Sequence, residues 1–185
     1  MKILLVGTGS IAKRHLKNLK KNQPDVDFYV YSRSNRTLPN TKAVKFEELN
    51  NRAYNLIIIA SDSDKHDSDL ELVLKLKART IFLEKPASLD LQTAKKLEYE
   101  IEKEKVNVRI GYDLRYHEGI KYLKEKFHDE ILLDENIIIF SQVGQNLSTW
   151  RKPRKDFEAY SFNQSRSGGV INDLSHELDF INYIS

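Results

Sequence analysis

A histidine near the end of the chain has acidic neighbours at helical spacing. Asp173 and His176 are three residues apart, as are His176 and Asp179, and Asn172 lies four before the histidine. Side chains at these spacings share one face of a helix, so they can meet. A carboxylate beside an imidazole fixes its tautomer and raises its basicity, which suits general acid–base work on a hydroxyl group. The pattern also fits an ordinary helix with an interior histidine.

A lysine stands in the tripeptide Glu84-Lys85-Pro86, directly after an apolar run over 80–83. If that run is a strand of a parallel sheet, Lys85 lies at its carboxyl end, where such sheets bind ligands. There the lysine can donate to a substrate oxygen and stabilise a developing alkoxide. Pro86 restricts the lysine to an extended backbone. Taken alone, the tripeptide is more typical of a surface loop.

The first apolar run leads into a turn of small residues, GTGSIA at 7–12, and then into a basic helix pattern. This strand–turn–helix context is typical of dinucleotide binding. Gly7 permits the tight turn, and Gly9 lets the backbone approach a pyrophosphate, while Ala12 allows close packing of helix on strand. The helix N-terminus, at Ser10 and Ile11, supplies the anion site.

The end of the second predicted strand bears on the choice between NAD and NADP. An acidic residue there holds the ribose 2′-hydroxyl, and a nearby arginine suits the 2′-phosphate. This chain has Ser32 and Arg33, followed by Ser34, Asn35 and Arg36, and no carboxylate. Two arginines and two serines favour NADP over NAD as the cofactor. An arginine in this loop can also simply face solvent.

Short apolar runs alternate with longer helical patterns over the first two thirds of the chain, which predicts the α/β class with a Rossmann doubly wound parallel sheet. Strands are predicted at 2–6, 27–32, 42–45, 55–60, 80–83 and 106–111. Helices are predicted near 11–21, 46–51, 66–77, 89–104 and 117–127. Ser88 is expected to cap the fourth of these helices. The helix at 66–77 has leucines at alternate positions, but its acidic start, with Asp67 and Asp69, favours a helix over a strand.

The pattern changes after Gly111. One long strand is predicted at 136–145, followed by a polar stretch to Ser167 and an apolar helix pattern over 169–184. We therefore predict a Rossmann domain over 1–115 and an incomplete α+β second domain over 116–185.

Composition excludes several classes of protein. The 185 residues include no cysteine, so a disulfide framework, a thiolate metal site and a cysteine nucleophile are excluded, and no metal site is predicted. An uninterrupted apolar run of about 18 residues, as a membrane span needs, is absent from the sequence. The net charge is only +3 and the lysines are scattered, which does not favour nucleic-acid binding. A cytoplasmic location is expected.

Together these motifs resemble the glucose–fructose oxidoreductase / inositol dehydrogenase / rhizopine-catabolism (Gfo/Idh/MocA) family over essentially the whole chain. The resemblance is carried by the glycine turn through His15, by Ala60-Ser61-Asp62 with His66, by Glu84-Lys85-Pro86, and by 111–116. The later stretches resemble a subgroup found among surface-polysaccharide and nonulosonic-acid biosynthesis genes; they are Trp150-Arg151 through Tyr160-Ser161, Gly168-Gly169 and 173–177.

The resemblance implies an NAD(P)-dependent oxidoreductase that moves hydride between nicotinamide and a sugar, nucleotide-sugar or cyclitol hydroxyl or carbonyl. In that chemistry His176 would be the acid–base, Lys85 would polarise the oxygen, and Asp173 would tune the histidine. Many relatives place the aspartate four residues before the histidine, where this chain has Asn172. Further cofactor contacts are expected from Ser61, His66, Glu84, Lys85, Asp113, Trp150 and Arg151.

The end of the chain departs from the family. The family's second domain continues as an open antiparallel sheet beyond the histidine helix and usually forms a dimer interface, so a homo-oligomer is expected. Here one predicted strand precedes the helix, and a single strand cannot make a sheet with a buried face. We therefore expect a C-terminally truncated product or fragment. The alternative to an active enzyme is a non-catalytic NAD(P)-binding remnant.

Overall fold

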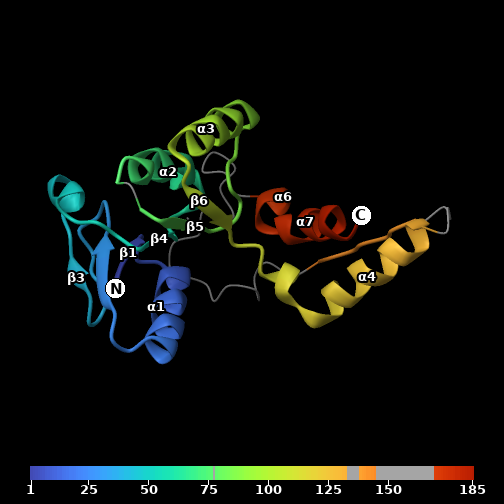
Figure 1. Ribbon diagram of the computed structural model, residues 1–185, viewed down its shortest axis with the longest axis horizontal. Coiled ribbons are helices and arrows are strands. Elements are labelled where there is room, and N and C mark those ends of the chain that lie inside the picture. The colour runs from blue at the N-terminus through green and yellow to red at the C-terminus, as the bar shows by residue number, and fades with distance from the viewer. Residues whose placement is uncertain (77, 133–137, 145–168) are drawn as a thin grey trace. The chain divides into compact units, whose positions relative to one another are not determined.

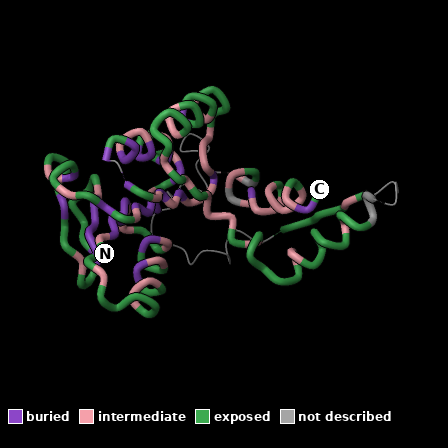
Figure 2. The backbone as a smooth tube through the Cα atoms, in the orientation of Figure 1, coloured by how far each residue is buried: buried purple, intermediate pink, exposed green. Residues whose placement is uncertain are grey.

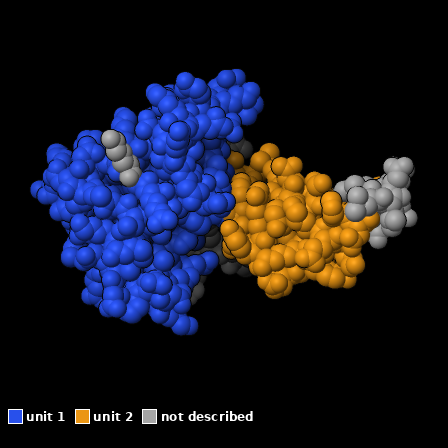
Figure 3. All heavy atoms as spheres, in the orientation of Figure 1, with its two compact units in different colours: residues 1–111 blue, residues 112–185 orange. Residues whose placement is uncertain are grey.

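The chain forms two compact units, which are shown in different colours in Figure 3. The computed structural model describes residues 1–76, 78–132, 138–144 and 169–185. Unit 1 covers Met1–Gly111 and unit 2 covers Tyr112–Ser185. The boundary falls slightly before the predicted one at 115/116, because the short helix η3 (Asp113–Tyr116) packs with the helices of unit 2.

Unit 1 is built on a six-stranded sheet in the order β3-β2-β1-β4-β5-β6, with every neighbouring pair parallel (Figure 1). This confirms the predicted Rossmann topology, and each predicted strand overlaps an observed one. The strands are β1 (Lys2–Val6), β2 (Asp27–Tyr31), β3 (Lys42–Ala43), β4 (Leu56–Ile59), β5 (Thr80–Leu83) and β6 (Asn107–Ile110). In such a sheet all the strands end at one edge, and ligands bind beyond that edge.

The helices of unit 1 connect successive strands. They are α1 (Ser10–Asn22), η1 (Phe46–Asn51), η2 (Ser63–Lys65), α2 (His66–Leu74) and α3 (Leu91–Glu104). The predicted cap of α3 is wrong. Asp90, not Ser88, caps this helix, since its carboxylate accepts from the backbone N–H of Thr93 at 2.7 Å. Ser88 instead hydrogen-bonds the backbone of Asp90.

Alternate side chains of the strands build a core on each face of the sheet. In β1, Leu4 and Val6 pack with α2 and α3, while Ile3 and Leu5 pack with α1 on the other face. Figure 2 shows the buried residues concentrated along these strands. Strands buried on both faces appear in the sequence as continuous apolar runs, which is why the short apolar runs located them.

The regular elements described in unit 2 are helices. Besides η3 it contains α4 (Glu118–Leu132), α6 (Val170–Asp173) and α7 (Ser175–Ile184), and α4 packs against α7. The strand predicted at 136–145 is wrong where the structure describes it, since 138–144 has no regular secondary structure. Ile138 and Phe140 are 93% and 85% exposed, and no described strand pairs with them, so the ladder that stabilises a strand is missing there. Among the described residues, no helix is long and apolar enough to cross a membrane.

Candidate functional site

The turn after β1 requires glycine at its first position. Gly7 has φ +106°, and its N–H donates to the Tyr31 carbonyl oxygen at 2.9 Å, which ties the turn to the end of β2. A Cβ at this position would lie 2.6 Å from the carbonyl oxygen of Ala60 and 2.8 Å from the backbone nitrogen of Ser61. Gly7 therefore lets the ends of β1 and β4 come together, as the sequence predicted for a tight turn.

The second glycine leaves space beside the start of α1. Gly9 is the N-cap residue of this helix, and a Cβ built on it meets nothing within 4 Å. No side chain caps the helix, and its first turn carries no acidic residue, so the first backbone N–H groups, from Ser10 and Ile11 onward, have no capping partner from a side chain. Ala12 is 0% exposed and packs on the sheet. Uncapped donors at a positive helix end, with room in front of them, fit a cofactor diphosphate.

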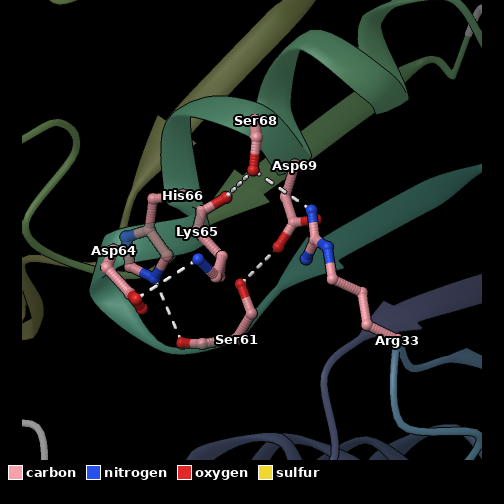
Figure 4. Close-up of polar contacts among 7 residues, drawn as sticks. All are labelled: Arg33, Ser61, Asp64, Lys65, His66, Ser68 and Asp69. Carbon is pink, nitrogen blue, oxygen red and sulfur yellow. Dashed lines mark hydrogen bonds and ion pairs between the residues drawn. The ribbon is translucent and has the colours of Figure 1, made fainter. Parts of the chain in front are cut away.

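The arginine after β2 is held by α2, as Figure 4 shows. The Nη2 atom of Arg33 lies 2.6 Å from Oδ1 of Asp69 and also donates to Ser68 Oγ at 3.1 Å. Oδ1 of Asp69 has no well-aligned hydrogen-bond donor, so this contact acts mainly through opposite charge. Ser32 is engaged locally, since its Oγ lies 3.0 Å from Ser34 Oγ. The predicted reader of the 2′-phosphate thus already has an anionic partner.

The loop after β4 is joined to the same cluster. Ser61 donates its hydroxyl to Oδ2 of Asp69 at 2.5 Å. His66 is 1% exposed, and its Nδ1 lies 2.7 Å from the Pro86 carbonyl oxygen, while its Nε2 lies 3.3 Å from the carbonyl oxygen of Ser61. A buried ring between two carbonyls joins the loops after β4 and β5. The ring of His66 thus has a structural role here, and its predicted cofactor contact stays a prediction.

The loop after β5 brings the predicted Glu84 and Lys85 to the same edge of the sheet. The N–H of Glu84 donates to the Ile59 carbonyl oxygen at 3.0 Å. Its carboxylate lies 2.6 Å from Nε2 of His15 on α1, an ionic hydrogen bond when the imidazole is protonated. A Cβ on Gly111 would be 3.2 Å from the same carboxylate, so this glycine leaves room for it. Lys85, half-buried, follows directly.

His176 in unit 2 has an acidic neighbour that its helical spacing did not indicate. Nδ1 of His176 lies 3.6 Å from Oδ1 of Asp113, and its ring meets that of Tyr112 edge-to-face with centroids 5.9 Å apart. The spacing argument for Asp173 needs one continuous helix, but a turn at Leu174 separates α6 from α7. The two residues therefore do not share one continuous helix, and the predicted role of Asp173 beside His176 stays a prediction. The side chain of Asp173 lies outside the described residues.

Asp179, the second predicted neighbour of His176, pairs with an arginine instead. Asp179 pairs with Arg115, whose Nε and Nη2 reach its two oxygens at 2.9 and 2.5 Å. The Arg115 guanidinium also lies over the rings of Tyr112 and Tyr183, and burial raises the pKa of the Tyr112 hydroxyl. This pair fixes α7 on η3, so it orients the segment that carries His176. Sequence reasoning had no signal for it, because the two partners are far apart in the chain.

Other predicted positions and hollows add nothing to these sites. Trp150 and Arg151 lie outside the described residues. A shallow cavity lies between α2 and α3, and it is lined mainly by charged side chains such as Glu71 and Lys96 and by no residue of the glycine turn. Among the described residues no group of histidines and acids could hold a metal ion.

Three comparisons relate the chain to known proteins. Residues 1–112 match the sequence model of the oxidoreductase family with an NAD-binding Rossmann fold, GFO_IDH_MocA. The whole chain is 22% identical over 197 aligned positions to inositol 2-dehydrogenase/D-chiro-inositol 3-dehydrogenase of Lacticaseibacillus casei, and covers 53% of that protein. The chain therefore spans about half the length of this relative.

Solved structures share the fold. A putative myo-inositol dehydrogenase from Sinorhizobium meliloti matches all of this chain and 55% of its own, at 17% identity and a TM-score of 0.70. Myo-inositol dehydrogenase from Lactobacillus casei, solved with NAD(H) and myo-inositol, matches 71% of this chain and 42% of its own, at 22% identity and a TM-score of 0.63. The order of strands, the glycine turn and the match over unit 1 lead to one conclusion: the chain belongs to the Gfo/Idh/MocA oxidoreductase family.

Proposed function

We propose that the chain binds a nicotinamide dinucleotide at the glycine turn and takes part in hydride exchange with a hydroxyl or carbonyl of a cyclitol or sugar. The observation that carries the proposal is the uncapped start of α1 beside the open space over Gly9. Backbone N–H groups there match the charge and the hydrogen-bonding needs of a diphosphate. Relatives named inositol dehydrogenases support the cyclitol or sugar substrate.

Each site residue has a task in this proposal. When bound, the nicotinamide supplies the hydride acceptor or donor. Lys85 follows β5 at the ligand edge of the sheet, and we assign to it the polarisation of the substrate oxygen. His176 takes or returns the hydroxyl proton, and the carboxylate of Asp113 lies 3.6 Å from its Nδ1.

The structure and the sequence also bear on the choice between NAD and NADP and on the class of substrate. Arg33 favours NADP, but Asp69 matches its charge. We therefore propose that NAD binds at least as well as NADP. The sequence features shared with the polysaccharide and nonulosonic-acid subgroup make nucleotide sugars the second substrate class after cyclitols.

The first test is a fluorescence titration of the 185-residue chain with NADH and NADPH. Saturable binding of either supports the cofactor site, and no binding to the folded chain refutes it. Turnover is then measured with NAD or NADP and a panel of myo-inositol and nucleotide sugars. Binding with no turnover on the whole panel favours the non-catalytic remnant.

A histidine variant tests the acid–base assignment. His176→Asn is expected to lower turnover by about 100-fold or more, the usual contribution of a general acid–base, while NADH affinity stays unchanged. His128→Asn on the exposed side of α4 is the matched control, and it should leave both quantities as in the parent chain. Equal turnover in the two variants would remove His176 from the mechanism.

A further inference from the structure

Asp69 is a buried carboxylate whose charge is matched by a partly exposed arginine. Its side chain is 0% exposed, whereas that of Arg33 is 41% exposed. A buried carboxylate is strongly disfavoured unless a cation or good hydrogen bonds compensate it. Here Arg33 supplies the cation and Ser61 supplies a hydroxyl at 2.5 Å.

The three residues of this cluster come from three different elements, as Figure 4 shows. Arg33 follows β2, Ser61 follows β4, and Asp69 lies in α2. The position of Arg33, just after the end of β2, is the one at which Rossmann proteins distinguish the 2′-hydroxyl of NAD from the 2′-phosphate of NADP. Ser61 is adjacent to the glycine turn, since a Cβ on Gly7 would lie 2.8 Å from the backbone nitrogen of Ser61. Asp69 therefore contacts both Arg33 after β2 and the Ser61 loop beside the glycine turn.

The charge of Asp69 affects how strongly Arg33 attracts a 2′-phosphate. A guanidinium without an acidic partner presents a full positive charge to the 2′-phosphate. With a carboxylate 2.6 Å away, the pair is neutral as a whole, and a dianion gains much less from it. The ribose 2′-hydroxyl is uncharged and loses little by the same pairing.

We propose that Asp69 is a specificity-determining residue of the cofactor site, which restrains binding of the 2′-phosphate by neutralising Arg33. This inference rests on the proposed cofactor site. Asp69 does not itself touch the cofactor, because its side chain is fully buried. Its effect passes through the charge and position of the arginine.

The test measures the ratio of NADH to NADPH dissociation constants at low ionic strength, where exposed charges are least screened. Asp69→Asn leaves Arg33 without its anion, and the ratio should shift toward NADPH by about tenfold or more. Arg33→Gln leaves the buried carboxylate unpaired and should shift the ratio toward NADH by about as much. The double variant Arg33→Gln/Asp69→Asn is neutral again and should return to the parent ratio.

Two controls separate charge from structural support. Glu71→Gln removes an acid from the same helix, one whose partner is Lys96, and should leave the ratio unchanged. Ser61→Ala removes a hydrogen bond to Asp69 without changing any charge, so it should alter both affinities in parallel. A second readout is the thermal stability of the free protein. Arg33→Gln should lower the Tm more than the double variant does, because the single variant leaves the buried Asp69 carboxylate without its cation.

The possible outcomes are distinct. If NADH and NADPH both fail to bind the parent chain, the proposed function fails before this inference is tested. If both bind and Asp69→Asn keeps the parent ratio, the inference is overturned. If Asp69→Asn does not fold, the other two variants decide, and the same ratio in Arg33→Gln and in the double variant overturns it.

Discussion

Replacing each glycine of the turn by alanine should separate folding from cofactor binding. In Gly7→Ala the new residue must adopt φ +106° with a Cβ 2.6 Å from a backbone oxygen. Backbone strain of this kind costs about 1–3 kcal/mol, and forcing apart packed backbone costs roughly as much again, so we expect a loss of about 2–6 kcal/mol. For a chain of this size that corresponds to a fall in Tm of roughly 5–20 °C.

Gly9→Ala should behave in the opposite way. Its φ of −68° is ordinary for alanine, and its Cβ would meet nothing within 4 Å. Alanine is a poorer N-cap than glycine, which costs about 1 kcal/mol or less. The methyl group, however, occupies the space assigned to the diphosphate, so NADH affinity should fall by tenfold or more, about 1.4 kcal/mol.

Thermal unfolding and an NADH fluorescence titration on the two variants check both halves of this reasoning. A Gly9→Ala protein that binds NADH as tightly as the parent would refute the assignment of the open space to the cofactor. A Gly7→Ala protein with the parent Tm would refute the steric argument for the turn.

Three further predictions concern stability. Ile57→Ala, at a fully buried position in β4, should destabilise unit 1 by about 2–5 kcal/mol in denaturant unfolding. Asp90→Ala should lower Tm at neutral pH but not in acid: the backbone N–H of Thr93 holds the pKa of this carboxylate below its ordinary 3.8, so its contribution is present above that pH and is lost as pH falls through the lower folded value. Equal losses at pH 7 and pH 2 would contradict this. Arg115→Ala should loosen α7 and cost about 1–2 kcal/mol, because Asp179 is mostly buried but the arginine is partly exposed, and hydrogen exchange in α7 against α1 measures it.

The sheet of unit 1 could be predicted because its determinants are local. Strands such as 2–6 and 80–83 are apolar runs bounded by turn residues, and the glycine turn carries its own geometry in Gly7. The ambiguous leucines of α2 show the limit of such patterns: both strand and helix fitted them, and the buried set is Leu70, Val73 and Leu74, a helical face. The acidic residues at the start of this segment predicted a helix, and the structure confirms it.

The parts of the site that were missed depend on contacts between distant segments. Nothing local to Arg33 indicates that Asp69 on a later helix will match its charge. The pairing of Asp173 with His176 assumed an unbroken helix, and the turn at Leu174 removes that assumption. Asp113 was predicted as a cofactor contact and lies beside His176 because η3 packs against α7. Helical spacing finds neighbours within one element only.

The place of β1 in the sheet has a consequence for how the chain is made. β1 lies between β2 and β4, and Ile3, Leu4 and Leu5 are 0% exposed once both neighbours are in place. During synthesis β1 emerges well before β4, so a growing chain holds this apolar strand with one edge unpaired. Open apolar edges are the sites at which chains associate wrongly. The strand β1, which is buried at the centre of the folded sheet, is therefore prone to wrong association until β4 has been translated.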